Sequence, residues 1–103
     1  IGQLGPVDQR APIIWFALGT AYLAAGQDAD AKARFERIVG SEYQRLYRPV
    51  EFVRSFYHLA RIAERQGDLV KARQHFARFA GYWKDGDLDR PQVEEALRKS
   101  QGS

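Results

Sequence analysis

Apolar residues recur at intervals of three and four along most of the chain, and glycine-containing turns interrupt them twice. The first series at this spacing consists of Trp15, Leu18, Gly19 and Tyr22, followed by Ala31 and Phe35. Gly26 separates the two halves of the series. This pattern is typical of one helix, a tight turn and a second helix. The sequence therefore predicts a helical hairpin within residues 12–45.

The same pattern returns at an offset of 41 residues. The second series consists of Phe56, Leu59, Ala60 and Ala63, followed by Ala72 and Phe76. Small residues in both series allow antiparallel helices to approach closely. We expect Gly26 and Gly67 to end the first helix of each pair in a left-handed conformation. We expect Asp28 and Asp68 to cap the helix that follows.

The first series matches the W-x-x-L-G-x-x-Y then A-x-x-x-F pattern and so resembles the tetratricopeptide repeat. The resemblance implies an all-α fold with two antiparallel helix-turn-helix pairs and a C-terminal capping helix, wound as a right-handed α–α superhelix. The family repeats every 34 residues. The offset of 41 therefore places about two extra helical turns around residues 41–49. Pro49 suits the first position of the next helix.

We expect a single domain over residues 1–103. Its expected parts are an extended leader at 1–11, a first repeat at 12–45 with an insertion to about 52, a second repeat at 53–86 and a capping helix at 89–99. The chain starts at Ile1 and contains no methionine, so we expect it to be part of a longer protein.

The segment from Trp83 to Pro91 reads W-K-D-G-D-L-D-R-P. It resembles the end of repeat regions at the C-terminus of bacterial multidomain signalling proteins. The resemblance implies a capping helix after this segment. It also implies a larger bacterial signalling or regulatory parent and a cytoplasmic location.

Composition and charge exclude several classes of protein. The net charge is +3, but acids alternate with arginines and no dense basic block occurs, which disfavours nucleic acid as a partner. The absence of cysteine removes disulfides and thiolate zinc sites. Residues 11–27 carry no charge, yet they include Pro12, Gly19 and Gly26. This run therefore favours a buried core helix over a membrane span.

No motif in the sequence predicts catalysis. Asp85, Asp87 and Asp89 have the spacing of a calcium loop, but Arg90 replaces the required glycine and Ala96 the bidentate glutamate. The two histidines lie on different predicted helices without metal-ligand spacing. No nucleophile elbow or phosphate loop is present. The sequence predicts no enzyme activity, no cofactor and no metal site.

In the resembled family, the first helix of each pair lines a concave groove. The groove positions of the first pair are almost entirely apolar: Ile13, Phe16, Ala17, Thr20, Leu23 and Ala24. Those of the second pair are mostly charged: Arg54, Tyr57, His58, Arg61, Glu64 and Arg65. The apolar face requires a cover, because an exposed apolar patch promotes association. Its candidate covers are residues 1–11, a preceding repeat, a second copy of the chain or an apolar peptide.

Arg54, His58, Arg61 and Arg65 of the second pair form a cationic strip, flanked by Tyr57, that suits an acidic peptide. The alternative is a solvated face on which Glu64 pairs with a neighbouring cation. We therefore expect a protein–protein interaction scaffold that binds a peptide or a neighbouring domain. The alternative is a homo-oligomerisation module that associates through the apolar first helix. The expected partner-binding residues are Arg54, Tyr57, His58, Arg61, Arg65, Ile13, Phe16 and Leu23.

Overall fold

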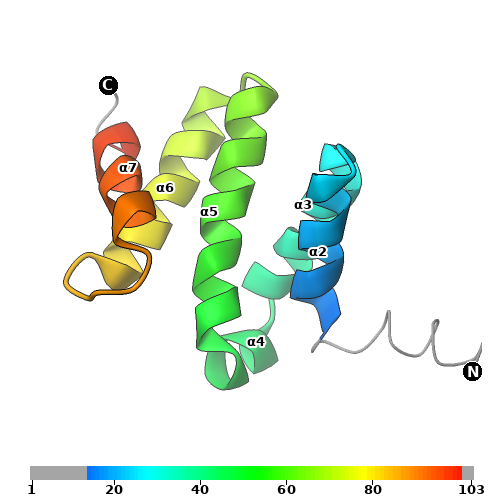
Figure 1. Cartoon of the computed structure of the whole chain (residues 1–103), viewed down its shortest axis with the longest axis horizontal. Helices are drawn as coiled ribbons and strands as arrows, with labels where there is room; N and C mark the ends of the chain where they lie inside the picture. Colours follow the sequence, from blue (N-terminus) through cyan, green and yellow to red (C-terminus); the bar gives the residue numbers. More distant parts are fainter. Residues whose placement is uncertain (1–13, 101–103) are drawn as a thin grey trace, which may run out of the picture. The chain divides into compact units, whose positions relative to one another are not determined.

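The computed structural model of the chain describes residues 14–100. Within this range the chain forms six α-helices and no strand (Figure 1). The first three helices are α2 (Trp15–Ala24), α3 (Asp28–Val39) and α4 (Glu42–Tyr47). The last three are α5 (Pro49–Arg65), α6 (Leu69–Trp83) and α7 (Arg90–Ser100). The predicted all-α fold is confirmed, whereas the expected leader at 1–11 and Ile13 lie outside the described residues.

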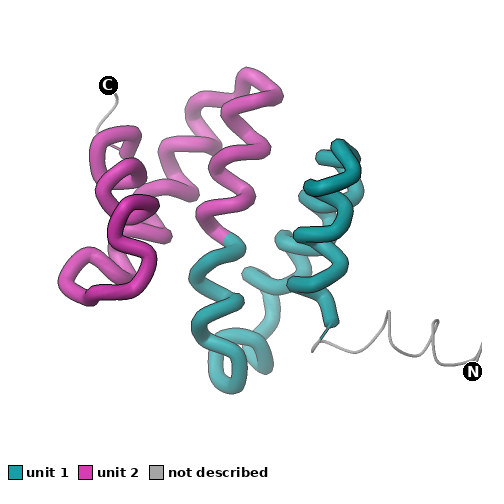
Figure 2. Tube along the Cα trace, viewed as in Figure 1, with its two compact units in different colours: residues 1–55 teal, residues 56–103 magenta. Residues whose placement is uncertain are grey.

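The chain divides into two compact units, Ile1–Ser55 and Phe56–Ser103. Figure 2 shows that the border between them falls inside α5. The first unit contains the packed pair α2 and α3, and the second contains the packed pair α6 and α7. No helix in the described part of the chain has the length and apolar character needed to cross a membrane.

Helices α2 and α3 meet where Gly19 faces Phe35. A Cβ atom at Gly19 would lie 2.7 Å from Cζ of Phe35, which is closer than carbon atoms approach. Phe35 is fully buried, and its ring also meets Phe16 edge-on with the centroids 5.8 Å apart. The predicted role of a small residue in close helix packing is confirmed here.

The second unit carries the equivalent residues 41 positions later. Ala60 occupies the place of Gly19, and Phe76 occupies the place of Phe35. Both Ala60 and Phe76 are buried. Tyr57 adds aromatic packing, since its ring meets Phe76 at a centroid distance of 6.0 Å.

Helix α7 closes the second unit against α6. Its Val93 and Ala96 side chains are fully buried. Arg90 organises the preceding loop, because its Nη1 donates to the carbonyl oxygens of Lys84 and Gly86 at 2.9 Å each. The predicted capping helix is present and begins one residue later than expected.

The turn within each helix pair has the same hydrogen-bond pattern. Gly26 has φ +77° and Gly67 has φ +80°, as the sequence predicts for a left-handed helix end. In the first turn, the amide of Gln27 donates to the Tyr22 carbonyl at 2.9 Å and that of Gly26 to the Leu23 carbonyl at 3.0 Å. This pair of bonds defines a Schellman motif, and equivalent bonds close the second turn.

The prediction for the helix starts is right in one pair and wrong in the other. Asp68 caps α6, because its carboxylate accepts from the Lys71 amide at 3.1 Å. Asp28, however, is the first residue of α3, and Gln27 holds the capping position without a side-chain capping bond. The two turns have equal length, so in both pairs the capping residue is the one directly after the glycine. In the first pair this residue is Gln27.

The residues beyond the family period form the separate short helix α4. Ser41 caps it, since its Oγ accepts from the Gln44 amide at 3.2 Å. Pro49 is the first residue of α5, as predicted. Proline tolerates this position because the first amides of a helix have no intrahelical acceptor.

We expect Gly19→Ala to lower the free energy of unfolding by about 1–3 kcal/mol, because its methyl group overlaps the buried Phe35 ring. Gly81→Ala is the matched control. Gly81 is also a helical glycine, but a Cβ atom there would meet nothing within 4 Å outside its own helix backbone. The control should raise stability by about 1 kcal/mol through helix propensity. Urea denaturation measures both, and equal stability of the two variants would contradict this packing.

Candidate functional site

The polar side of α5 in the second unit is joined to α7 by hydrogen bonds. The Tyr57 hydroxyl donates to Oε1 of Glu95 at 2.6 Å. Nη1 of Arg61 donates to the Tyr57 oxygen at 2.9 Å and lies 4.0 Å from Oε2 of Glu95. Arg61 also pairs with Glu64 on its own helix, with Nε and Oε1 3.5 Å apart. These contacts connect residues 38 positions apart in the sequence.

Lys99 completes this network from the last turns of α7. Its Nζ lies 2.8 Å from Oε2 of Glu95 and 2.9 Å from Oε2 of Glu64. The ammonium group also lies 5.3 Å from the centroid of the buried Phe76 ring, in cation–π geometry. Two cations, Arg61 and Lys99, thus face two carboxylates.

The network favours the charged forms of Glu95 and Lys99 and the neutral form of Tyr57. Burial alone would raise the pKa of the Glu95 carboxyl, but hydrogen bonds from Lys99 and Tyr57 and the nearby charges of Lys99 and Arg61 lower it below its ordinary 4.5. Hydrogen bonds to Glu95 and Glu64 raise the pKa of Lys99. Burial raises the pKa of Tyr57, so its hydroxyl remains a donor at neutral pH.

The predicted cationic strip is divided by this network. Arg61 and Tyr57 belong to the network and contact α7. His58 is half-buried, and Arg65 is exposed at the end of α5. Arg54 is half-buried and lies on the part of α5 that belongs to the first unit. Partner binding by these residues stays a prediction.

The predicted apolar face belongs to α2, which contains no charged residue. Phe16 and Leu23 are half-buried, and Ala17 is exposed. Phe16 is already in contact with Phe35, so only part of its ring is available to a partner. On the other side, Arg37 of α3 lies 4.9 Å above the ring of buried Trp15.

A surface that the sequence analysis missed lies on α4 and the start of α5. We define it as the insert surface, which consists of Tyr43, Leu46, Tyr47 and Val50. Their side chains are large and apolar, and their exposed fractions are 49%, 59%, 69% and 40% respectively. The rings of Tyr43 and Tyr47 pack together with centroids 5.0 Å apart. Leu46, Tyr47 and Val50 follow Tyr43 by three, four and seven residues. This spacing in the extra segment was the sequence signal that could have identified the surface.

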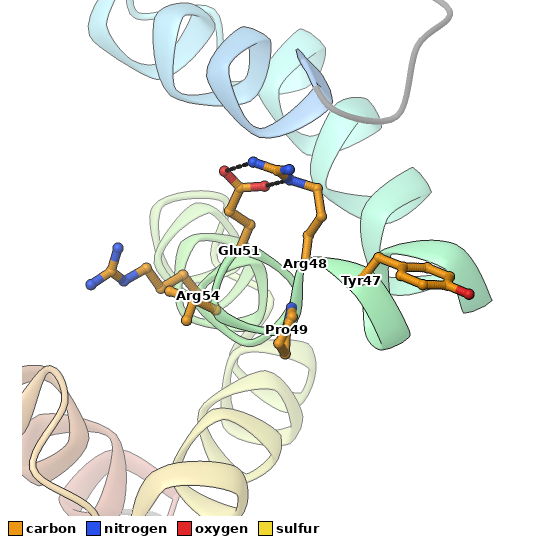
Figure 3. Close-up of a pocket in the computed structure, with 6 residues that line it drawn as sticks. Tyr47, Arg48, Pro49, Glu51 and Arg54 are labelled. Atoms are coloured by element: carbon orange, nitrogen blue, oxygen red, sulfur yellow. Dashed lines mark hydrogen bonds and ion pairs between the residues drawn. The ribbon is translucent and has the colours of Figure 1, made fainter.

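An open pocket of about 330 Å³ adjoins the insert surface. Its lining residues are Tyr47, Arg48, Pro49, Val50, Glu51 and Arg54. Figure 3 shows the Arg48 guanidinium facing the Glu51 carboxylate, with their Nε and Oε1 atoms 2.6 Å apart. In the same view, the Tyr47 ring and the Arg54 side chain extend to opposite sides of Pro49.

No metal-binding cluster is found in the part of the chain that the structure describes. Between residues 14 and 100, no group of three or more His, Asp or Glu side chains is placed to hold a metal ion. His75 packs against Phe56 with ring centroids 6.2 Å apart. Asp85 and Asp87 are exposed in the loop that Arg90 organises, and Asp89 has φ 52° just before α7.

The family model for the tetratricopeptide repeat matches residues 14–41 and 54–85. The matched ranges cover more than half of the chain. They contain α2 and α3 in the first range, and most of α5 with all of α6 in the second. Neither the curated proteins nor the solved structures contain a match to the chain.

We expect Glu95→Gln to lower stability at neutral pH by roughly 1 kcal/mol, because it weakens the bonds from Lys99 and Tyr57. The pKa of Glu95 is lowered by folding, so its contribution is present above pH 4.5 and is lost as the pH falls through the folded-state pKa. Thermal melting from pH 7 to acid should therefore show the variant converging on the wild type.

Glu94→Gln is the control for this measurement. Glu94 is the neighbouring carboxylate of α7 and lies 3.8 Å from Arg90 in a more exposed ion pair. Its replacement should change the melting curve less at every pH, because exposed pairs contribute little. An equal effect of the two substitutions would contradict the role given to Glu95.

Proposed function

This chain belongs to the tetratricopeptide repeat family, and we propose from this premise that it is a protein-binding scaffold within a larger protein. Repeats of this family generally mediate protein–protein interaction. The observation that carries the proposal is the presence of two matched helix pairs whose first helices, α2 and α5, keep partly exposed side chains. The ligand in this proposal is a peptide segment or a neighbouring domain of another protein.

The charged side of α5 is the proposed binding face. It presents Arg54, His58 and Arg65 at helical spacing. Arg61 and Tyr57 support this face from the network with α7, which limits the conformational freedom of the helix. Guanidinium groups bind carboxylates in two-pronged geometry, so an acidic segment is the proposed partner. Restricted side chains lose less entropy when the partner binds.

The proposed parent is a bacterial signalling or regulatory protein that acts in the cytoplasm. This part of the proposal is supported by the W-K-D-G-D-L-D-R-P segment alone. In such a protein, the scaffold positions a partner or a neighbouring domain and performs no chemical step itself. An all-helical repeat fold of this family is typically a non-enzymatic scaffold.

A second proposed function, self-association through α2, is favoured by one observation. Helix α2 has no charged residue, yet Phe16 and Leu23 are only half-buried and Ala17 is exposed. Burial of this face against a second copy would remove apolar area from water. The two proposed functions use different helices and are therefore separable by substitution.

For the first function, we expect acidic peptides to bind more tightly than their amide counterparts. The probes are a fluorescein-labelled octapeptide pool rich in Asp and Glu and a pool with Asn and Gln in their place. Combined His58→Gln and Arg65→Gln should weaken binding of the acidic pool about tenfold, as expected for the loss of one charge-assisted contact. Fluorescence anisotropy titration measures the dissociation constants.

Arg73→Gln is the matched control for this experiment. It removes one positive charge, as the double variant does at neutral pH, but from an exposed position on α6. Binding should survive in the control. Equal weakening by the control would show attraction by net charge alone, and equal binding of both pools would refute the acidic partner.

For the second function, we expect the mass from light scattering to rise towards a dimer as the protein concentration increases. Ala17→Glu places a charge on the apolar face without removing a core side chain and should keep the protein monomeric. Ala33→Glu, at an exposed position of α3, is the control and should behave as the wild type. A wild-type monomer at every concentration rules out this second function and leaves the first intact.

A further inference from the structure

Helix α6 differs from the other described helices in its charge. It contains Lys71, Arg73, His75 and Arg78 but no Asp or Glu. Every other helix between residues 14 and 100 that contains a basic residue also contains at least one carboxylate. Side chains of opposite charge commonly pair along such a helix. Helix α6 has no residue of its own that can neutralise its basic side chains.

The exposed basic side chains of α6 are not neutralised by other helices either. Lys71, Arg73 and Arg78 are exposed. Among residues 14–100, no carboxylate forms an ion pair with any of the three. The guanidinium of Arg78 lies 5.1 Å from the centroid of the Phe56 ring. An aromatic ring offers no carboxylate oxygen to the N–H groups of a guanidinium, so Arg78 can still donate to an acidic partner.

An open pocket of about 240 Å³ lies beside Arg78. Its lining residues are Ala77, Arg78, Gly81 and Tyr82. Ala77 and Gly81 belong to one row of side chains at a spacing of four, and Arg78 and Tyr82 belong to the next row. The pocket is therefore the groove between two neighbouring rows of one helix. Helices pack together when a row of side chains from one enters such a groove of the other.

The rest of the described chain packs on a different side of α6. The buried residues of the helix are Ala72, Phe76, Phe79 and Ala80, and by helical periodicity they lie opposite the pocket. Val70 lies seven residues before Ala77, hence on the pocket side, and is 64% exposed. We define this side as the α6 face, which consists of Val70, Lys71, Ala77, Arg78, Gly81 and Tyr82.

We propose that the α6 face binds an amphipathic helix of a partner protein that has one apolar row of side chains with Asp or Glu beside it. An apolar side chain of the partner enters the pocket above Ala77 and Gly81. The partner's carboxylates pair with Lys71 and Arg78, which are seven residues apart and therefore lie on the same side of α6.

Charge and shape together favour this partner over two others. A symmetric pair of copies would place the basic α6 against itself, and like charges repel. A nucleic acid would pair with the basic side chains, but its phosphates would leave Val70 and the pocket without an apolar partner. An acidic amphipathic helix satisfies both the basic side chains and the apolar groove.

This inference goes beyond the function proposed above. It assigns a second binding surface, on the second helix of a repeat, and it requires a helical ligand. The acidic octapeptides that test the α5 face are too short to form a stable helix. The two surfaces are therefore tested with different probes, and either proposal can fail without the other.

The test begins with a phage-displayed library of helical peptides of about 18 residues, selected on the intact chain. We expect the enriched sequences to carry apolar residues at helical spacing with an Asp or Glu beside them. Synthetic peptides with these sequences are titrated by fluorescence anisotropy. Gly81→Leu should weaken their binding at least tenfold, because the added side chain fills the pocket.

Arg78→Gln tests the charged part of the α6 face. It should weaken binding about fivefold, as expected for one charge-assisted contact. Peptides with Asn and Gln in place of their acids should bind more weakly to the wild type. They should lose nothing further on Arg78→Gln, because the pairing that this variant removes is already absent.

Two variants of α3 are the matched controls. Ala33→Leu adds a side chain at an exposed helical position, as Gly81→Leu does. Arg34→Gln removes an arginine that also lies over an aromatic ring, 6.0 Å from the centroid of Tyr22. Both controls should bind the peptides as the wild type does. Circular dichroism should show no loss of helix in Gly81→Leu, because leucine forms helices better than glycine.

Four results would overturn the inference. The first is that no enriched peptide loses affinity on Gly81→Leu, or that Ala33→Leu weakens binding equally. The second is equal binding of the acidic peptides and their amide counterparts. The third is loss of binding in the combined His58→Gln and Arg65→Gln variant, which places the peptides on α5. The fourth is a wild-type dimer in light scattering that Gly81→Leu converts to a monomer, because the occupant is then a second copy.

Discussion

The close approach of a helix backbone to a buried phenylalanine ring is the constraint on which the first helix pair depends. In the first pair this is the contact between Gly19 and Phe35, where no Cβ atom fits. In the second pair, Ala60 and Phe76 stand at the equivalent sequence positions, and both are buried. Because the ring fills the space between the helices, the side chains on the remaining sides of α2 and α5 are directed away from the pair. The surfaces available for binding follow from this packing.

The surfaces that remain exposed after the helices pack differ in their charge. In the second unit, Tyr57, Arg61 and Glu64 of α5 bind Glu95 and Lys99 of α7, so part of an apparently cationic face contributes to the attachment of the last helix. In the first unit, α4 buries its polar side chain and exposes its aromatic ones. The repeats thus provide a stable frame, and the inserted helix provides the most unusual surface.

Much of the fold was predictable because its determinants are local. The two left-handed turns follow from Gly26 and Gly67, and the start of α5 follows from Pro49. The prediction that Asp28 caps α3 was wrong because the capping residue is the one directly after the glycine, and that residue is Gln27. The candidate site was predicted less well. The contacts of Arg61 with Tyr57 and Glu95 were not foreseen, and the insert surface was not recognised.

The sequence by itself determined the helices, their turns and the repeat, because helical periodicity and glycine conformation act over a few residues. Only the tertiary structure decided which polar side chains meet and which apolar ones remain outside. The bond from Tyr57 to Glu95 joins residues on different helices, and no local pattern specifies it. The outward direction of Tyr43 and Tyr47 was likewise decided by how α4 docks, because a six-residue helix has no stable orientation of its own.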